Sequence, residues 1–177
     1  AGRQLKRLPA GSGAVAIHRG DARALPFPDH SFDFIYCNPP FYQLEKYSAD
    51  GRDLANHSDI ASWLSASGEM MAEMRRVVKP GHLIVTVMAD ARINGDLVPL
   101  HSYWIEEAVR QGLILHDIAV QHLISQQIRI WRIAYDRRRT AKAHEYVITF
   151  RAPGQRVGVG SQKRVHPEVE PPEEPSG

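Results

Sequence analysis

The segment Asn38-Pro39-Pro40-Phe41 has the clearest chemical potential in this sequence, and it directly follows the apolar run 32–37. Each proline disfavours the helical conformation in the residue before it, so the turn is expected to be extended and stiff. Such a turn presents the Asn38 amide oxygen and a backbone carbonyl that no following helix uses. Together these acceptors can hold both hydrogens of a planar amino group, while the ring of Phe41 stacks on the ring that bears the amine.

An exocyclic amine of adenine or cytosine is a poor nucleophile because its lone pair is delocalised into the ring. Two in-plane acceptors favour the pyramidal nitrogen that an attack requires. With a sulfonium methyl group as the electrophile, alignment and fixed dipoles do most of the work and no strong base is needed. The tetrapeptide therefore indicates methyl transfer to a ring amine. The alternative is a proline-rich loop that only ends a strand.

The elements that must position this segment follow an α/β pattern, because strand-like apolar runs alternate with helical stripes. Strands are expected at 14–18, 32–37, 82–88, 113–124 and 145–150, and helices at 60–78 and 100–111. Ser58 or Asp59 can cap the first helix, 79–81 (Lys-Pro-Gly) ends it, and Gly112 stands where the second helix should end. The run 82–88 is rich in β-branched residues, which predicts burial on both faces.

The stretch HRGDARALPFPDHSFDFIYCNPPFYQLEKYS resembles amino-directed S-adenosylmethionine-dependent methyltransferases, in which an Asn/Asp/Ser-Pro-Pro-aromatic motif is catalytic. The segments RDLANHSDIASWL, MAEMRRVVKPGHLIVTVMAD and RRRTAKAHEYVITFRAP look like the DNA N4-cytosine/N6-adenine methylase domain. The resemblance covers residues 20–153. It implies a Rossmann-like class I methyltransferase sheet. It also implies methyl transfer from S-adenosylmethionine to the exocyclic amine of adenine (N6) or cytosine (N4) in DNA.

The same resemblance assigns roles to individual residues. The catalytic motif corresponds to Asn38, Pro39, Pro40 and Phe41. The cofactor site corresponds to Asp21, Ala22 and Asn38, with Asp21 at an acidic position that commonly contacts the adenine of the cofactor. An asparagine at the first catalytic position favours adenine N6 over cytosine N4.

A basic stretch supplies the candidate contacts to DNA. Residues 128–142 hold six basic residues and one acid, although the whole chain carries a net charge of only +2. The residues expected to meet a phosphate backbone are Arg137, Arg138, Arg139 and Lys142. A duplex base must be flipped to reach the site, and Phe41, Tyr42 or Tyr47 is expected to receive it by stacking. The alternative interpretation is a solvated loop with ordinary loop aromatics.

The family also needs a Gly-rich cofactor loop that follows its first strand and opens a helix. Gly11-Ser12-Gly13 precedes an expected strand instead, and the glycines at 158–160 lie in the tail. In the strand order 3-2-1-4-5-7-6 of such methyltransferases, two strands separate 14–18 from 32–37. We therefore expect a sheet that is incomplete at its N-terminal half. Either an upstream segment was removed, which we favour, or another chain supplies it, or the protein is degenerate.

Composition excludes several other classes. The single cysteine, Cys37, cannot form an internal disulfide, and no run of transmembrane length or signal peptide is present, so a cytoplasmic protein is expected. The nine histidines show no ligand spacing, so no metal is expected. Cytosine-C5 methyltransferases use a nucleophilic cysteine directly after a proline. That class is disfavoured because the prolines here follow Cys37. Asp90 could face the site, but a helix cap or an exposed residue is the favoured interpretation. Residues 1–153 are expected to form the partial catalytic domain, and 154–177 a flexible Pro/Glu/Gly-rich tail.

Two alternative functions remain open at this point. The same chemistry could act on RNA adenine N6 or on the side-chain amide of a protein glutamine (N5), since such enzymes also use Asn-Pro-Pro-aromatic. Alternatively, the chain could be a non-catalytic nucleic-acid-binding subunit of a split methyltransferase, with the cofactor held by its partner.

Overall fold

A computed structural model describes residues 15–42, 48–123 and 144–155 of the chain. The elements along the chain are β1 (Phe32–Cys37), the short 3-10 helix η1 (Leu54–Asn56), α1 (Ile60–Val77), β2 (Val78–Met88), β3 (Ala91–Ile93), β4 (Asp96–Val98), α2 (Leu100–Arg110), β5 (Ile114–His122) and β6 (His144–Arg151). Several predictions fall outside the described residues, namely the glycines at 11–13, Tyr47, the basic stretch 128–142 and the tail from 156 onward.

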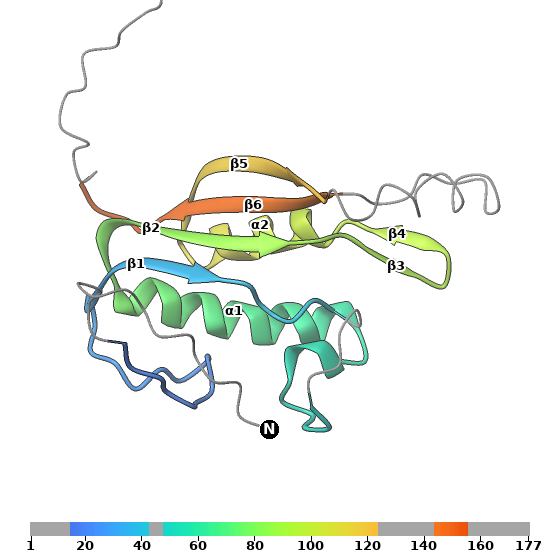
Figure 1. The fold of residues 1–177 in the computed structure, drawn as a ribbon, viewed down its shortest axis with the longest axis horizontal. Coiled ribbons are helices and arrows are strands. Elements are labelled where there is room, and N and C mark those ends of the chain that lie inside the picture. The colour runs from blue at the N-terminus through green and yellow to red at the C-terminus, as the bar shows by residue number, and fades with distance from the viewer. Residues whose placement is uncertain (1–14, 43–47, 124–143, 156–177) are drawn as a thin grey trace, which may run out of the picture.

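One sheet with the order β1-β2-β6-β5 organises the fold (Figure 1). β1 runs parallel to β2, and β6 runs antiparallel to both of its neighbours, β2 and β5. This order reproduces the last four strands, 4-5-7-6, of the expected methyltransferase order. The prediction of a partial α/β sheet is therefore confirmed.

The strand predicted at 14–18 is wrong. Residues 15–18 form no strand, and the side chains of Val15 and Ile17 are 63% and 75% exposed. A strand exists only where a neighbour takes up its backbone hydrogen bonds, and no described segment pairs with these residues. The alternation of apolar residues was therefore not enough to predict a strand here.

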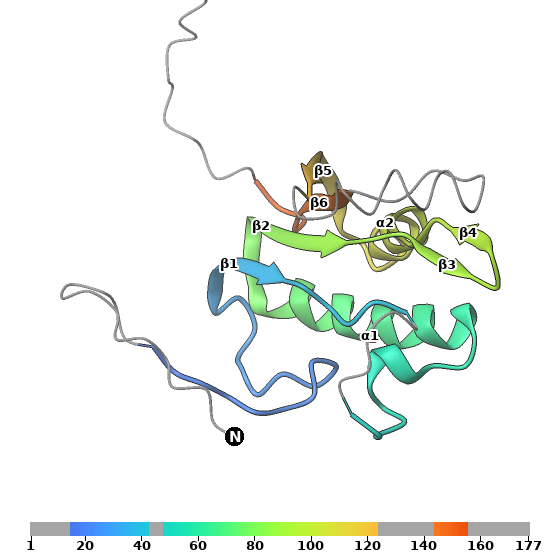
Figure 2. The ribbon, with the colours of Figure 1, turned by 45° about the vertical axis from the view of Figure 1, so that its right-hand side comes forward.

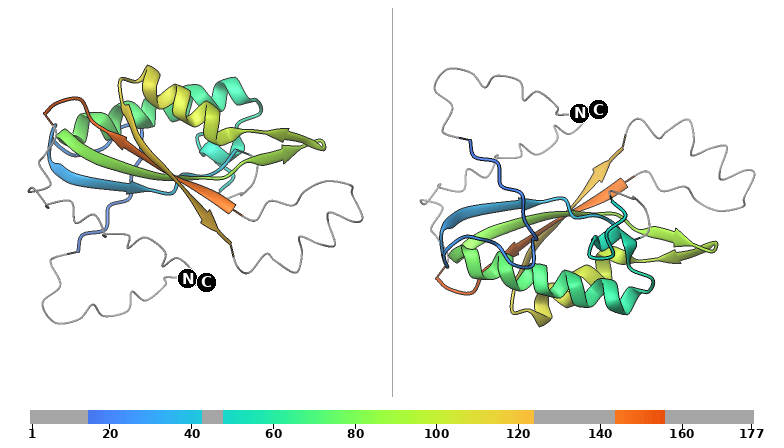
Figure 3. Two further views of the ribbon diagram at one scale, coloured as in Figure 1. Left: turned by 90° about the horizontal axis from the view of Figure 1, so that it is seen from above. Right: turned by 90° about the horizontal axis from the view of Figure 1, so that it is seen from below.

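Both long helices cover the same face of the sheet (Figures 1 and 3). α1 begins at its predicted cap, because the Asp59 carboxylate accepts a 2.7 Å hydrogen bond from the Ser62 amide. The two indole rings at the centre of this layer, those of Trp63 and Trp104, have centroids 5.8 Å apart and are fully buried. The Trp104 Nε1 donates to Thr86 Oγ1 at 3.0 Å, which ties α2 to β2.

The opposite face of the sheet carries no helix among the described residues (Figure 3). Phe34 and Tyr36 of β1 are 54% and 62% exposed there. In β2, Ile84 is buried under the helices, whereas Leu83 and Val85 are only partly buried. The prediction that β2 is buried on both faces is therefore wrong for Leu83 and Val85, which no described helix covers, although Val87 further along the same face is buried.

The hairpin formed by β3 and β4 was not predicted (Figure 2). Its turn residues Asn94 and Gly95 both have positive φ, 52° and 98°, as in the tight turns that match the twist of two strands. The hairpin lies at the edge where β1 and β2 end. By the antiparallel pairing, β5 ends and β6 begins at that edge too, with His122 opposite His144.

None of the described helices is long and apolar enough to cross a bilayer.

Candidate functional site

Asn38 lies where β1 ends, at the carboxyl edge of the sheet, and its side chain is exposed. No hydrogen bond to the Asn38 side chain or to the Pro39 carbonyl is made within the described residues. Pro39 itself is buried and Pro40 is partly buried, so the turn is packed from behind. The Asn38 amide is therefore exposed at the start of a turn whose prolines are packed against protein.

Phe41 and Tyr42 follow the turn, and both were expected to offer exposed rings on which a base could stack. The structure places them differently. Phe41 is 8% exposed and Tyr42 4% exposed, and both belong to the hydrophobic core. The Tyr42 hydroxyl donates to the Ser58 carbonyl at 3.1 Å, and its ring centroid lies 6.0 Å from that of Trp63. In this conformation both rings pack against protein. Sequence reasoning missed this because it treated the residues after Pro40 as a loop without a partner helix.

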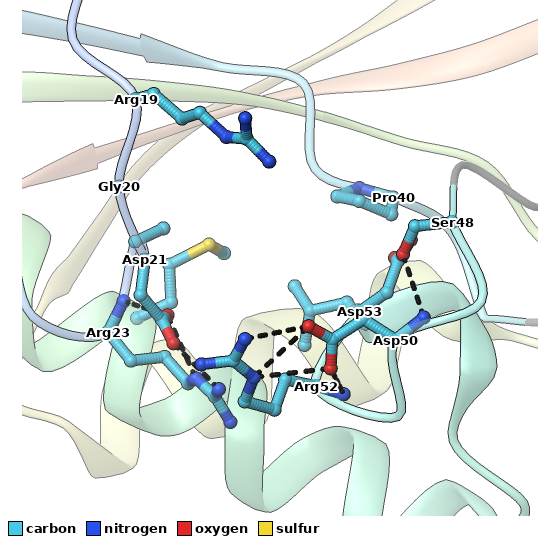
Figure 4. Close-up of a pocket in the computed structure, with 12 residues that line it drawn as sticks. Arg19, Gly20, Asp21, Arg23, Pro40, Ser48, Asp50, Arg52 and Asp53 are labelled. Atoms are coloured by element: carbon cyan, nitrogen blue, oxygen red, sulfur yellow. Dashed lines mark hydrogen bonds and ion pairs between the residues drawn. The ribbon is translucent and has the colours of Figure 1, made fainter.

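A cavity of about 630 Å³ lies between the turn and two loops (Figure 4). Its lining brings together Asp21 and Ala22, which were predicted cofactor residues, and Pro40 of the predicted catalytic motif. The far wall is the loop 48–54, which the sequence had not linked to the site. This volume is within the range of about 300–1,000 Å³ typical of small-molecule sites. The structure therefore joins two sequence-distant motifs in one pocket.

The near wall of this cavity is the segment 19–23, and α1 holds it in place through Arg76. The Arg76 guanidinium donates to the carbonyl oxygens of Leu25 and Phe27 at 3.0 and 2.8 Å, and to Asp29 at 2.8 Å. Glu73, one turn earlier, pairs with Arg76 and accepts a 2.8 Å hydrogen bond from the Leu25 amide. These bonds fasten a segment without regular structure to a helix, and so position Asp21 just upstream.

Asp21 and Arg23 form a pair within the near wall. The Asp21 carboxylate accepts hydrogen bonds from the Arg23 backbone amide and Nε at 3.0 Å each, and from Nη2 at 2.8 Å. These bonds, chiefly the side-chain ones, lower the pKa of Asp21 to about 2. Asp21 is therefore a fixed negative charge on the cavity wall at neutral pH.

The far wall repeats this arrangement with Asp50 and Arg52 at the same spacing (Figure 4). Arg52 donates to Asp50 through its amide, Nε and Nη2, and the pKa of Asp50 is lowered to about 2 for the same reason. The two pairs are close enough to act on each other electrostatically, since Arg52 also lowers the pKa of Asp21. Asp-x-Arg recurs in the sequence at 21–23 and 50–52, but also at 90–92 and 136–138, so the pattern alone does not identify this wall.

The loop 48–54 is held by its own hydrogen bonds. The Asn56 side-chain amide donates to the carbonyl oxygens of Ser48 and Asp50 at 2.9 and 2.8 Å. Asp53 caps η1 by accepting from the Ala55 amide, and it also accepts from the Ser48 hydroxyl at 3.0 Å. The far wall is therefore a self-supporting structure.

At the end of β2, Asp90 connects three elements. Its Oδ1 lies 2.6 Å from Nδ1 of His101 and accepts from the His101 amide at 3.3 Å, so Asp90 caps the first turn of α2 from outside the helix, whose N-cap residue is Pro99. The His101 ring stacks on Tyr146 of β6 with centroids 4.0 Å apart. Burial and the Asp90 carboxylate both raise the pKa of Tyr146. No group of three His, Cys, Asp or Glu residues in the described ranges could hold a metal ion.

The predicted DNA contacts Arg137, Arg138, Arg139 and Lys142 lie outside the described residues, as does Tyr47. The described ends that flank the basic stretch, Leu123 and His144, follow β5 and open β6 respectively. Both ends lie at the sheet edge that carries Asn38, because the antiparallel pairs fix that arrangement. The chain therefore leaves the sheet after Leu123 and returns to it at His144 on the edge that carries Asn38.

Three comparisons with known proteins bear on this site. A family model described as DNA methylase matches residues 32–176. No curated protein matches the chain at a significant level. Among solved structures, a protein from Thermus thermophilus described as a putative DNA modification methylase has a TM-score of 0.59 at 23% identity. That match covers 82% of this chain and 58% of the Thermus protein.

Two further structures support the same fold. The Thermus protein in complex with S-adenosyl-L-methionine matches with a TM-score of 0.58 at 21% identity, over 81% of this chain and 57% of that one. The PvuII DNA methyltransferase, described as cytosine-N4-specific, has a TM-score of 0.55 at 17% identity, over 76% of this chain and 49% of that one. The chain thus spans about half the length of these proteins.

Proposed function

Since the chain belongs to the DNA methylase family, we propose that it transfers a methyl group from S-adenosylmethionine to an exocyclic amine of a DNA base. Adenine N6 is the favoured target and cytosine N4 the alternative. The observation that carries this proposal is the exposed Asn38 at the carboxyl end of β1, beside a cavity lined by Pro40 and Asp21. In open α/β sheets, ligands bind outside the carboxyl ends of the strands.

In the proposed reaction Asn38 and the Pro39 carbonyl accept the two hydrogens of the target amine and hold it in line with the methyl donor. The nitrogen–carbon bond forms as the carbon–sulfur bond breaks, and one amine proton leaves to solvent after transfer. Preorganised dipoles and alignment supply the rate enhancement, so no strong base is needed. Phe41, which is 8% exposed, is proposed to contact the base.

The cavity has features suited to the cofactor. S-adenosylmethionine would supply an electrophilic methyl group on a sulfonium. Its adenine carries an amine that can donate to an ionised carboxylate, and Asp21 is such a carboxylate on the wall of a cavity of suitable size. Asp21 and Ala22 are therefore proposed to bind the adenosine end. A glycine-rich loop from outside the described residues, from the same polypeptide or a partner chain, is proposed to hold the methionine end.

DNA is proposed to approach along the carboxyl edge of the sheet. The basic residues Arg137, Arg138, Arg139 and Lys142 would contact its phosphates, because the stretch that contains them is attached at this edge. Tyr47 remains a candidate to stack on the flipped base. Tyr42 would first have to leave its packing against Trp63 to do so.

The test is a methyl-transfer assay with tritiated S-adenosylmethionine on unmethylated DNA, RNA and protein. Incorporation into DNA that is lost in Asn38→Ala is expected, and mass spectrometry of the digested DNA identifies N6-methyladenine or N4-methylcytosine. The matched control is Asn94→Gly, which changes an exposed asparagine in a turn whose positive φ glycine accepts. Transfer that survives Asn38→Ala contradicts the mechanism. Salt-sensitive DNA binding without cofactor binding supports the non-catalytic subunit instead.

A further inference from the structure

The two Asp-x-Arg pairs of the cavity look equivalent in sequence. They differ in how many acceptor positions of the carboxylate are occupied by hydrogen bonds. An ionised carboxylate offers about four acceptor positions, two on each oxygen. Asp50 accepts from three Arg52 donors, but Nε is shared between its two oxygens at 3.2 Å each, so each oxygen takes two contacts. Asp21 accepts twice on Oδ1, from the Arg23 amide and Nε, but only once on Oδ2, from Nη2. Within the described residues, Asp21 thus keeps one acceptor position on Oδ2.

Arg23 determines which acceptor position of the Asp21 carboxylate remains open. Its guanidinium is planar, and the three bonds from the amide, Nε and Nη2 leave the Asp21 carboxylate no freedom to rotate. Arg23 is itself held more firmly than its counterpart, because its side chain is 22% exposed whereas that of Arg52 is 73% exposed. Glu69 Oε2 of α1 lies 4.0 Å from Arg23 Nε as well.

We propose that Arg23 is a positioning residue for the cofactor: it fixes the Asp21 carboxylate so that the second acceptor position of Oδ2 receives the exocyclic amine of the adenine ring. The Asp50–Arg52 pair, whose carboxylate has no position left, forms the opposite wall and makes no such bond. The recognised chemistry is a purine 6-amino group, and a 6-oxo purine lacks the donor. This inference rests on the proposed function, which places the adenosine end of the cofactor in this cavity.

The simplest alternative is that Arg23 only neutralises Asp21. A lysine in place of Arg23 separates the two ideas, because it keeps the positive charge but cannot form the planar, two-point contact. If charge alone mattered, Arg23→Lys would behave as the wild type.

The experiment is calorimetric titration of the full chain with S-adenosylhomocysteine and with S-inosylhomocysteine, which carries an oxo group instead of the 6-amine. The wild type is expected to prefer the adenine compound by about 10-fold or more, since a hydrogen bond to a charged group discriminates at that level. In Arg23→Ala and Arg23→Lys the preference is expected to fall to about 2-fold or less. Arg52→Ala is the matched control, and it is expected to keep the wild-type preference whatever its affinity.

Each outcome decides between the proposals. A wild type that binds neither compound contradicts the proposal that Asp21 and Ala22 of this chain bind the adenosine end on their own. A wild type that binds both compounds equally, or an Arg23→Lys variant that keeps the preference, contradicts the positioning role alone. Circular dichroism of each variant shows whether it is folded, and because the preference is a ratio within one variant, a loss of folded fraction does not alter it.

Discussion

Nδ1 of His101 lies 2.6 Å from Oδ1 of Asp90, and this contact closes the base of the β3–β4 hairpin. Asp90 immediately precedes β3, and His101 is the second residue of α2. Because Asp90 is almost fully buried and also caps α2, removing its carboxylate leaves both the His101 ring and the His101 amide without their acceptor.

We therefore expect Asp90→Ala to lower the free energy of unfolding by about 1–3 kcal/mol, because a buried carboxylate and its bonds to the partly buried His101 are lost. Urea denaturation measures this change. Asp96→Ala, an exposed change in the same hairpin, serves as the control and is expected to stay within about 0.5 kcal/mol of the wild type. Equal stability of both variants would show that the Asp90–His101 contact does not contribute.

The buried hydrogen bond between Trp104 and Thr86 gives a second prediction. Thr86→Val keeps the shape but leaves the Trp104 Nε1 donor without its acceptor, so a loss of about 1–3 kcal/mol is expected. A double-mutant cycle with Trp104→Phe, measured by chemical denaturation, isolates the coupling. Additive effects of the two substitutions would refute a direct contribution of this bond.

Arg76 gives a third prediction, which concerns the cavity. Arg76→Ala removes the donors to Leu25, Phe27 and Asp29, so the segment that leads from Asp21 should detach from α1. Limited proteolysis is expected to cut within 19–29 faster in this variant, and affinity for S-adenosylhomocysteine to fall. Arg75→Ala on the same turn is the control, since Arg75 instead contacts the Gln111 carbonyl. Unchanged cleavage in Arg76→Ala would count against this anchoring role.

Cys37 gives a fourth prediction. Burial raises the pKa of its thiol to about 11, so almost no thiolate exists at pH 8. The folded protein should react slowly with a thiol reagent such as dithionitrobenzoate, and unfolding in urea should restore rapid reaction. Methyl transfer should survive Cys37→Ala, because the proposed mechanism uses no sulfur nucleophile. Complete loss of transfer in a folded Cys37→Ala variant would contradict the proposed mechanism and support covalent catalysis by Cys37.

The pH dependence of Asp21 gives a fifth prediction. Its pKa is lowered from 3.8 to about 2 in the folded chain, so its contribution to stability is fully present above pH 4 and is lost as the pH falls towards 2. The contribution is small, because the side chain is 41% exposed and solvent screens the pair. The stability difference between wild type and Asp21→Asn should shrink over this range. Carbon-13 chemical shifts of the carboxyl group follow the titration directly, and a midpoint near 4 would exclude the tight pair.

The strand β1 and the turn after it were predictable from the sequence. Phe32–Cys37 is the strand that its apolar run indicated, and the prolines that follow it end it by their own covalent geometry. The cap at Asp59 and the turn at Gly112, whose φ is 82°, are equally local. Such features depend on residues within one turn of each other, so a sequence contains all the information that they need.

Other features depended on contacts between distant residues. The stretch 15–18 has the apolar alternation of a strand but no partner, and so it does not form one. Phe41 and Tyr42 directly follow the Asn38–Pro40 turn in the sequence, yet their burial depends on neighbours such as Trp63, which lies about twenty residues further along the chain.

The amino-acid sequence by itself determined the chemistry available at the end of β1 and the residue types that a cofactor would meet. Only the tertiary structure decided that Asp21, Pro40 and the Asp50–Arg52 pair line one cavity, and that Asp21 rather than Asp50 keeps an open acceptor position. The physical reason is that a strand end or a cap is specified by local backbone geometry. A cavity is specified by packing between segments that the sequence keeps far apart.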